Sequence, residues 1–104
     1  MDNILKQIIE ILSSYSGVIK VVLFGSRANL TNKTYSDYDI AFETEYMTDK
    51  EINILIINTL DRVETLHKID LIHINSVTNK ELLQNIKGFG KVLYQKDSGA
   101  KFSE

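Results

Sequence analysis

The stretch IKVVLFGSRANLTNKTYSDYDIAF, residues 19–42, decides the fold of this chain. It opens with an apolar run, Ile19 to Phe24, whose β-branched residues are typical of a strand buried on both faces. Gly25 and Ser26 end this strand, and a polar loop follows. From Asp37 to Phe42 polar and apolar residues alternate, which predicts a second strand with one face in the core. The loop of about eight residues is too short for a crossover helix, so we expect the two strands to pair antiparallel.

Patterns on either side of this stretch complete a small α/β domain. Helices are predicted over 2–15, 49–66 and 79–87, and further strands over 69–74 and 91–94. The capping boxes Thr48-x-x-Glu51 and Thr78-x-x-Glu81 open the second and third helices, and Gly88 is placed at the end of the third. This order predicts one domain over residues 1–95, a small mixed β-sheet with helices packed over it, followed by a flexible tail over 96–104.

Composition narrows the function classes. With 104 residues there is room for one core only, and 43% hydrophobic residues are ordinary for a globular domain. Twelve Lys+Arg against fourteen Asp+Glu give a net charge of -2, so we expect no direct nucleic-acid binding. The absence of cysteine excludes disulfides, thiol catalysis and cysteine-based zinc sites. No apolar run is long enough for a membrane span, and we expect a cytoplasmic protein.

The chemistry lies where the two central strands meet their loop. Gly25 has no side chain to keep an anionic ligand away from the backbone, and Ser26 adds a hydroxyl. Asp37 and Asp39 stand two residues apart on a strand, so both carboxylates leave one face with Cα atoms about 6.5–7 Å apart. Carboxylates at this spacing can converge on two Mg²⁺ ions about 3.5–4 Å apart. Taken singly, Gly-Ser is usually a turn and Asp-x-Asp a solvated strand end; together they indicate a metal and phosphate site.

The spacing Gly25-Ser26-x10-Asp37-x-Asp39 resembles the signature of the polymerase-β-like nucleotidyltransferase superfamily. The flanking sequences LFGSRA (23–28), SDYDI (36–40) and GKVLY (90–94) are similar to its minimal nucleotidyltransferase (MNT) branch. The resemblance covers about residues 4–95 and includes the order of helices and strands. One position departs from it, because Leu30 stands where relatives often carry glycine.

The resemblance implies a nucleotidyltransferase fold and transfer of a nucleoside monophosphate from an NTP to a hydroxyl, with two divalent metals. The third carboxylate of the family corresponds to Asp70. Asp37, Asp39 and Asp70 are then the catalytic residues that bind two Mg²⁺ ions, or Mn²⁺ in their place. Because phosphoryl transfer depends on positioning and charge stabilisation, the residues Gly25, Ser26 and Arg27 are assigned to the nucleotide phosphates.

The family also implies a partner. MNT proteins commonly pair with HEPN-domain toxins, which predicts an antitoxin that transfers AMP from ATP, or a nucleotide from another NTP, to a hydroxyl such as a tyrosine of a helical HEPN-type toxin. The alternative is an antitoxin whose site is idle and which acts by stoichiometric binding. A ligand-binding domain without enzymatic activity is a third interpretation. The acceptor, the base preference and homo-oligomer formation stay open.

Several other residues are assigned to structure rather than chemistry. We expect His73 on the sheet face opposite Asp70, and His67 at the C-terminal end of the second helix. Tyr35 and Tyr38 are expected to pack rather than to stack on a base. In the second helix we place Ile52, Leu55, Ile56, Leu60 and Val63 on the core side. Ile54 and Ile57 exceed one core face, and this surplus is either core or a partner surface.

Overall fold

The computed structural model describes residues 2–28 and 36–96. The elements, in chain order, are α1 (Asn3–Ser13), β1 (Val18–Phe24), the 3-10 turn η1 (Gly25–Arg27), β2 (Tyr38–Thr44), α2 (Asp49–Arg62), β3 (Ile69–His73), the 3-10 turn η2 (Ile74–Ser76), α3 (Lys80–Phe89) and β4 (Lys91–Gln95). All predicted helices and strands are present, with ends that shift by a few residues. The predictions for Leu30, Tyr35 and the tail after residue 96 lie outside the described residues.

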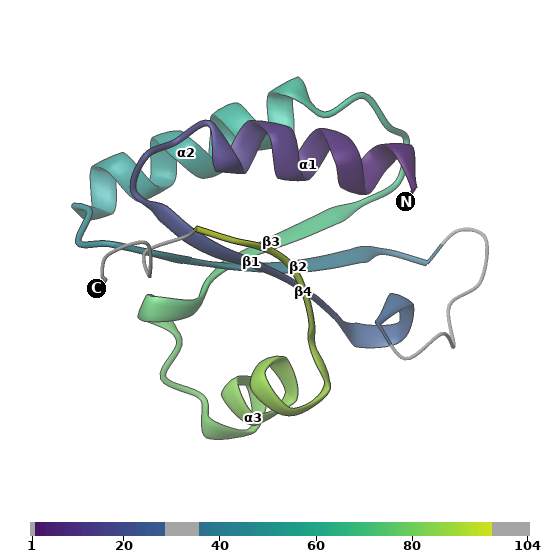
Figure 1. The fold of residues 1–104 in the computed structure, drawn as a ribbon, viewed down its shortest axis with the longest axis vertical. Coiled ribbons are helices and arrows are strands. Elements are labelled where there is room, and N and C mark those ends of the chain that lie inside the picture. The colour runs from purple at the N-terminus through teal and green to yellow at the C-terminus, as the bar shows by residue number, and fades with distance from the viewer. Residues whose placement is uncertain (1, 29–35, 97–104) are drawn as a thin grey trace, which may run out of the picture.

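The four strands form one mixed sheet in the order β3-β2-β1-β4. The central pair β1 and β2 is antiparallel, as the short loop predicted, and β1 also pairs antiparallel with β4. β2 and β3 run parallel, because α2 provides the crossover between them. In Figure 1, α1 and α2 cover one face of the sheet and α3 covers the other. The predicted mixed α/β architecture is confirmed.

The sheet separates two hydrophobic clusters of different size. The larger lies under α1 and α2 and takes Val21 and Leu23 from β1. The smaller lies under α3, and its buried members are Val22, Phe24, Ala41 and Ile86. β1 therefore contributes side chains to both clusters, which confirms the prediction of a strand buried on both faces.

The connection after α2 corrects one prediction. The capping box of α2 is present, with the Thr48 hydroxyl and the Glu51 carboxylate bonded to each other's backbone amides. The helix ends at Arg62, earlier than the predicted residue 66. Just beyond it, the Gln7 side chain of α1 accepts from the Glu64 amide at 2.8 Å and donates to the Glu64 carbonyl at 3.4 Å. His67 consequently lies in the connection to β3 and not at a helix end.

The outer face of α2 is more apolar than a solvated helix requires. Leu60, predicted to face the core, is 41% exposed, and the core position is taken by the buried Thr59. The surplus residues Ile54 and Ile57 are 55% and 68% exposed, so they form no part of the core. Among the described helices, α2 is the longest, and none has the length and apolar character needed to cross a membrane.

The two glycines of the α3–β4 segment differ in their surroundings. The helix does not end at Gly88 as predicted but continues to Phe89, with Gly90 as its cap residue. A Cβ on Gly88 would meet nothing within 4 Å. On Gly90 it would lie 2.1 Å from the Ile86 carbonyl oxygen and 2.5 Å from a Val22 methyl, too close for any side chain.

We therefore expect opposite effects from alanine at these positions. Gly88→Ala should stabilise the protein by about 0.5–1 kcal/mol, because alanine loses less backbone entropy in a helix. Gly90→Ala should destabilise it, because the helix end must move away from β1 to admit the methyl group. Thermal unfolding of both variants measures the difference, and equal midpoints would contradict it.

Candidate active site

The carboxylates meet at the end of the sheet where β1 ends and β2 and β3 begin. In the strand register, Asp39 of β2 lies opposite Phe24 of β1 on one side and opposite Asp70 of β3 on the other. Side chains alternate along a strand, so Asp39 and Asp70 share the α3 face with Ala41 and Ile72. Figure 1 shows this end of the sheet on the right, beside η1. Two of the three predicted carboxylates are therefore direct neighbours.

The proximity of Asp39 and Asp70 affects the pKa of Asp39. Burial, the charge of Asp70, a hydrogen bond with Asp70 and the charge of Asp37 together raise the pKa of Asp39 above its ordinary value. Lys68 acts in the opposite direction, with its ammonium 3.6 Å from an Asp70 carboxylate oxygen. The remaining repulsion means that a cation between the two carboxylates would stabilise the ionised pair.

Asp37 lies near Asp39 and Asp70, but the three carboxylates are not arranged as a ready metal site. It precedes β2 instead of lying within it as predicted, because the strand begins at Tyr38. Together with Leu66, His67 and Lys68, Asp37 lines a hollow of about 370 Å³. Over residues 2–28 and 36–96, no group of three acidic or histidine side chains is already arranged to hold a metal ion. The structure thus places Asp37 within electrostatic reach of Asp39, and its role as a third ligand stays a prediction.

The turn after β1 is built against Asp39. Gly25 adopts a φ of 75°, a left-handed conformation that favours glycine. A Cβ on Gly25 would lie 2.2 Å from an Asp39 carboxylate oxygen, so a side chain is excluded on steric grounds as well. Gly25 and Ser26 are the first two residues of η1. The turn and the acidic strand, which are separate motifs in the sequence, form one continuous site.

The family described as "Polymerase beta, Nucleotidyltransferase" matches residues 6–99 of the chain. This chain is a polymerase-β-type nucleotidyltransferase domain. The resemblance inferred from the sequence is therefore confirmed, and the matched range contains Gly25, Ser26, Asp37, Asp39 and Asp70. No curated protein matches the chain.

Solved structures share the nucleotidyltransferase fold. A toxin–antitoxin structure with AMP-PNP has a TM-score of 0.67 and 26% identity, over 92% of this chain and 76% of that chain. A tri-AMPylated Shewanella oneidensis HEPN toxin in complex with MNT antitoxin has a TM-score of 0.62 and 22% identity, over 88% and 69%. The MntA–HepT toxin–antitoxin structure gives the same values. The likenesses at 22% identity show the fold alone.

Arg27 of the nucleotidyltransferase motif has partners within the chain. Its Nε and Nη2 atoms donate to the Ser36 carbonyl oxygen at 3.2 and 2.8 Å. Its Cζ atom lies 3.8 Å from the centroid of the Tyr38 ring. The prediction that Arg27 binds phosphate is untested, but these contacts already direct two of its donors to the backbone.

Tyr38 connects the candidate active site to the start of α1. It is 2% exposed, which confirms that it packs, and the ring of His67 meets it edge-on at 5.5 Å. Its hydroxyl donates to an Asp2 carboxylate oxygen at 2.5 Å. Burial and this bond raise the pKa of Tyr38 to about 12. Against the opposing effect of burial, the bonds from Tyr38 and the α1 amides lower the pKa of Asp2.

Sequence reasoning missed two residues near the nucleotidyltransferase site, Asp2 and Lys68. The carboxylate of Asp2 also caps α1 by accepting from the amides of Ile4 at 2.7 Å and Leu5 at 3.2 Å. An acidic residue directly before a helical pattern is a recognisable N-cap signal, but its bond to Tyr38 has no counterpart in the sequence. Lys68 was overlooked because its place beside Asp70 depends on the course of the connection from α2.

His73 is structural, as predicted. It lies on the face opposite Asp70, buried beside Phe42, with ring centroids 5.2 Å apart. Its Nε2 shares a hydrogen bond with the Thr44 hydroxyl at 2.8 Å and its Nδ1 with the Ser76 hydroxyl at 2.7 Å. Burial lowers the pKa of His73 and favours the neutral ring.

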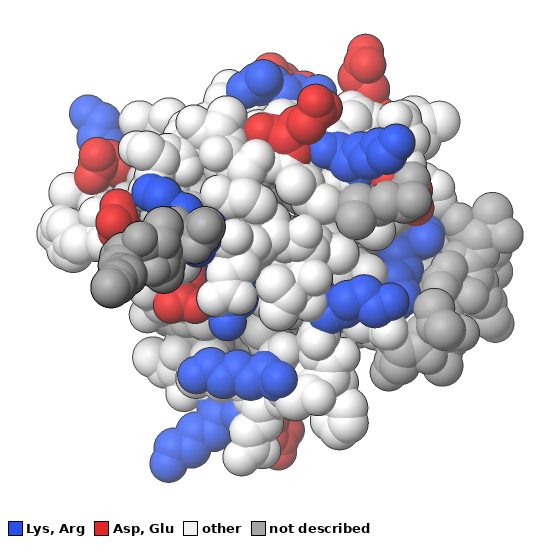
Figure 2. Space-filling model, in the orientation of Figure 1, with Lys and Arg blue, Asp and Glu red and all other residues white. Residues whose placement is uncertain are grey.

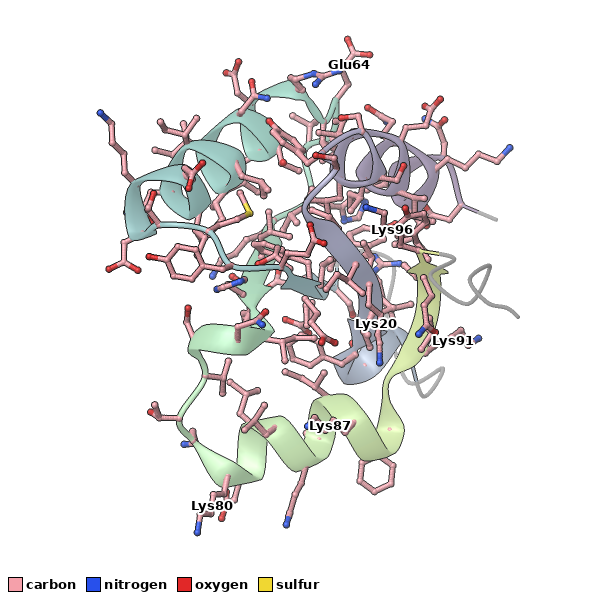
Figure 3. The ribbon with its side chains drawn as sticks, turned by 60° about the vertical axis from the view of Figure 1, so that its left-hand side comes forward. Lys20, Glu64, Lys80, Lys87, Lys91 and Lys96 are labelled. Carbon is pink, nitrogen blue, oxygen red and sulfur yellow. The ribbon has the colours of Figure 1, made fainter. Side chains whose placement is uncertain are left out.

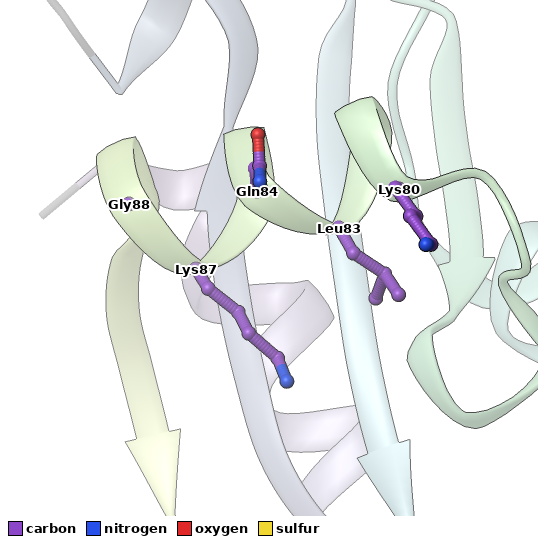
Figure 4. Close-up of a pocket in the computed structure, with 5 residues that line it drawn as sticks. All are labelled: Lys80, Leu83, Gln84, Lys87 and Gly88. Carbon is purple, nitrogen blue, oxygen red and sulfur yellow. The ribbon is translucent and has the colours of Figure 1, made fainter.

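Outside the nucleotidyltransferase site, the α3 side of the molecule carries a group of lysines. Figure 2 shows Lys and Arg side chains over the lower half of the face, where α3 lies in Figure 1. Figure 3 shows Lys80 and Lys87 on α3, and Lys20 and Lys91 on the neighbouring strands. Lys80 and Lys87 also line a shallow hollow of about 580 Å³ with Leu83, Gln84 and Gly88 (Figure 4). The Lys20 ammonium lies 4.0 Å from a Glu43 carboxylate oxygen, and Glu81 stands in the first turn of α3, so acidic groups balance part of this charge.

Proposed function

We propose that this protein is a metal-dependent nucleotidyltransferase that transfers AMP from ATP to a hydroxyl of a HEPN-type toxin, with release of pyrophosphate, and that it acts as the antitoxin of that toxin. The observation that carries the proposal is the pair Asp39 and Asp70 on adjacent strands, with the Gly25 turn packed against Asp39. The family match supports the reaction class. The solved complexes of similar fold, one containing AMP-PNP and one an AMPylated HEPN toxin, support the nucleotide and the partner.

The chemistry of the carboxylates fits divalent metal. Mg²⁺ is bound in phosphoryl-transfer sites by one or two carboxylates together with phosphate oxygens and water. Asp39 and Asp70 provide two such groups, and their repulsion is relieved by a cation. When bound, two divalent ions neutralise charge on the phosphates and lower the pKa of the attacking hydroxyl.

The residues of the site would have separate roles in metal binding, proton transfer and phosphate binding. Asp37 and Asp39 would hold the ions that orient the triphosphate, and Asp70 would complete the site next to the acceptor hydroxyl and accept its proton. Gly25 and Ser26 would bring backbone amides and a hydroxyl to the phosphates from a turn that is packed against Asp39. By the assignment made from the sequence, Arg27 would bind the phosphates at the same turn.

The acceptor is expected on a macromolecule because the site is open. The hollow beside Asp37 is bordered by Leu66, whose side chain is fully exposed, so the described residues do not enclose a small acceptor. A partner protein would supply the missing wall. The exposed apolar ridge Ile54, Ile57 and Leu60 on α2 is a candidate contact surface for it.

A transfer assay tests the proposal. The protein is incubated with Mg²⁺, α-labelled ATP and a candidate HEPN-domain toxin, and label on the toxin is measured with and without EDTA. We expect metal-dependent labelling by the unaltered protein and none by an Asp37→Asn/Asp39→Asn variant. If both neutralise the toxin equally without label transfer, the protein is a binding-only antitoxin and the proposed activity is wrong.

Metal binding has its own measurement. In a thermal shift titration, Mg²⁺ or Mn²⁺ with ATP should raise the unfolding midpoint, because ligands that bind only the folded state stabilise it. At a concentration 100 times the dissociation constant the gain is about 2.7 kcal/mol. An unchanged midpoint with metal and nucleotide both present would contradict the proposed site.

A further inference from the structure

Contacts of Arg27 connect the two parts of the proposed site, the phosphate turn and the acidic segment. The Gly25–Ser26 turn and the Asp37–Asp39 segment are connected through residues 29–35, which lie outside the described part of the chain. Arg27, directly after the turn, donates two hydrogen bonds to the carbonyl oxygen of Ser36. This carbonyl belongs to the peptide bond that links Ser36 to Asp37. Arg27 thus restrains the backbone at the first carboxylate.

Tyr38 extends this restraint to α1. The guanidinium of Arg27 lies over one face of its ring at 3.8 Å, and the Tyr38 hydroxyl is bonded to Asp2 at 2.5 Å. Asp2 is itself fixed by the two α1 amides that it caps. Figure 1 shows the start of α1, η1 and the start of β2 at the same end of the molecule. The residue between the two carboxylates is therefore fixed from both its ring face and its hydroxyl.

Arginine suits this position for reasons unrelated to phosphate. Its planar group can donate from Nε and Nη2 to one carbonyl and lie flat on an aromatic ring at the same time, which a lysine ammonium cannot do. Binding a phosphate through the same two donors would release Ser36 from Arg27. The observed contacts therefore favour a role through Tyr38 and Ser36 over direct contact with the nucleotide.

We infer that Arg27, Tyr38 and Asp2 form a positioning lock that sets the distance between the phosphate turn and the metal-binding carboxylates. The inference rests on the proposed nucleotidyl transfer, and it gives Arg27 the role of a positioning residue. Displacement of reacting groups by about 1 Å can reduce a rate by about 10²-fold. Loosening the lock should accordingly lower the rate of transfer while leaving nucleotide binding nearly unchanged.

The variants Arg27→Lys and Tyr38→Phe test the lock. Arg27→Lys keeps the charge but loses the fork and the stacking face, and Tyr38→Phe keeps the ring but loses the bond to Asp2. In the transfer assay, we expect Arg27→Lys to lower kcat at least tenfold with the KM for ATP within twofold, and Tyr38→Phe to act in the same direction. One matched control is Arg62→Lys at the end of α2. The other is Tyr15→Phe, which removes a hydroxyl that accepts a hydrogen bond from the Asn58 side chain.

A second measurement does not depend on activity. The Tyr38 amide donates to the Lys68 carbonyl at 2.9 Å, so its hydrogen exchange reports on the start of β2. Its exchange in the metal-free protein should be at least tenfold faster in both lock variants than in the two controls. A higher KM for ATP with unchanged kcat in Arg27→Lys, or unchanged exchange at Tyr38, would overturn the inference. Failure of the proposed function is distinguishable, because the unaltered protein would then transfer no label while the exchange result still decides the lock.

Discussion

Asp39→Asn is expected to abolish transfer and yet to stabilise the metal-free protein. Loss of a residue that only supports a metal ligand costs about 10–100-fold in metal affinity or activity, so loss of a central ligand should cost more than about 10²-fold. Stability should rise because the substitution removes a partly buried charge; its burial and its repulsion from Asp70 and Asp37 raise the pKa of Asp39. Like charges opposite each other on neighbouring strands cost up to about 1 kcal/mol, and each kcal/mol shifts the midpoint of a domain this size by about 4–8 °C.

The pH dependence provides the control for Asp39→Asn. The pKa of Asp39 is raised in the folded state, so the folded protein binds the proton more tightly than the unfolded chain does. The penalty for ionising Asp39 is then full at neutral pH and disappears as the pH falls to the ordinary value of 3.8. The stability difference between Asp39→Asn and the unaltered protein should therefore shrink between pH 7 and pH 4. A constant difference over this range would contradict the electrostatic explanation.

Gly25→Ala should impair both folding and activity. Alanine at a φ of 75° costs about 1–3 kcal/mol of backbone strain. Its Cβ would also lie 2.2 Å from the Asp39 carboxylate, so either the turn or Asp39 must move. At about 4–8 °C per kcal/mol, we expect a midpoint lowered by about 4–24 °C, together with transfer reduced by about 10²-fold or more.

Gly17→Ala is the matched control for Gly25→Ala. A Cβ on Gly17 would meet the Met47 sulfur at 3.5 Å, which is ordinary van der Waals contact. This variant should unfold near the midpoint of the unaltered protein and transfer AMP normally. If Gly25→Ala has the same unfolding midpoint and transfer rate as Gly17→Ala, the close approach between the turn and Asp39 is not required for stability or activity.

The fold could be predicted from the sequence because several local signals agree. The buried run before Gly25, the alternation after Asp37 and the capping box at Thr48 each determine one element, and the short loop determines the antiparallel pairing. The assignment of Asp70 to the same site as Asp39 came from the family resemblance. Spacing alone relates residues on one strand and says nothing about the register between β2 and β3.

Two features that the sequence did not predict, the end of α2 and the contacts of Arg27, depend on long-range contacts. The end of α2 depends on Gln7 of α1, which binds the backbone at Glu64 and has no signal near residue 62. The assignment of Arg27 to the phosphates was made from its place after Gly25 and Ser26 and stays a prediction. Its contacts with Ser36 and Tyr38 appear only when the chain returns to the sheet.

The unequal division of the core by the sheet has a consequence for how ligands act on this protein. Asp39 is the cross-strand neighbour of Phe24, and Phe24 belongs to the small cluster under α3, where Ile86 is the one buried residue of that helix. Such a layer can detach at a lower free energy than the layer formed by α1 and α2. If ATP and metal bind the carboxylate site only while α3 is packed on the sheet, their binding free energy would add to the free energy needed to detach α3.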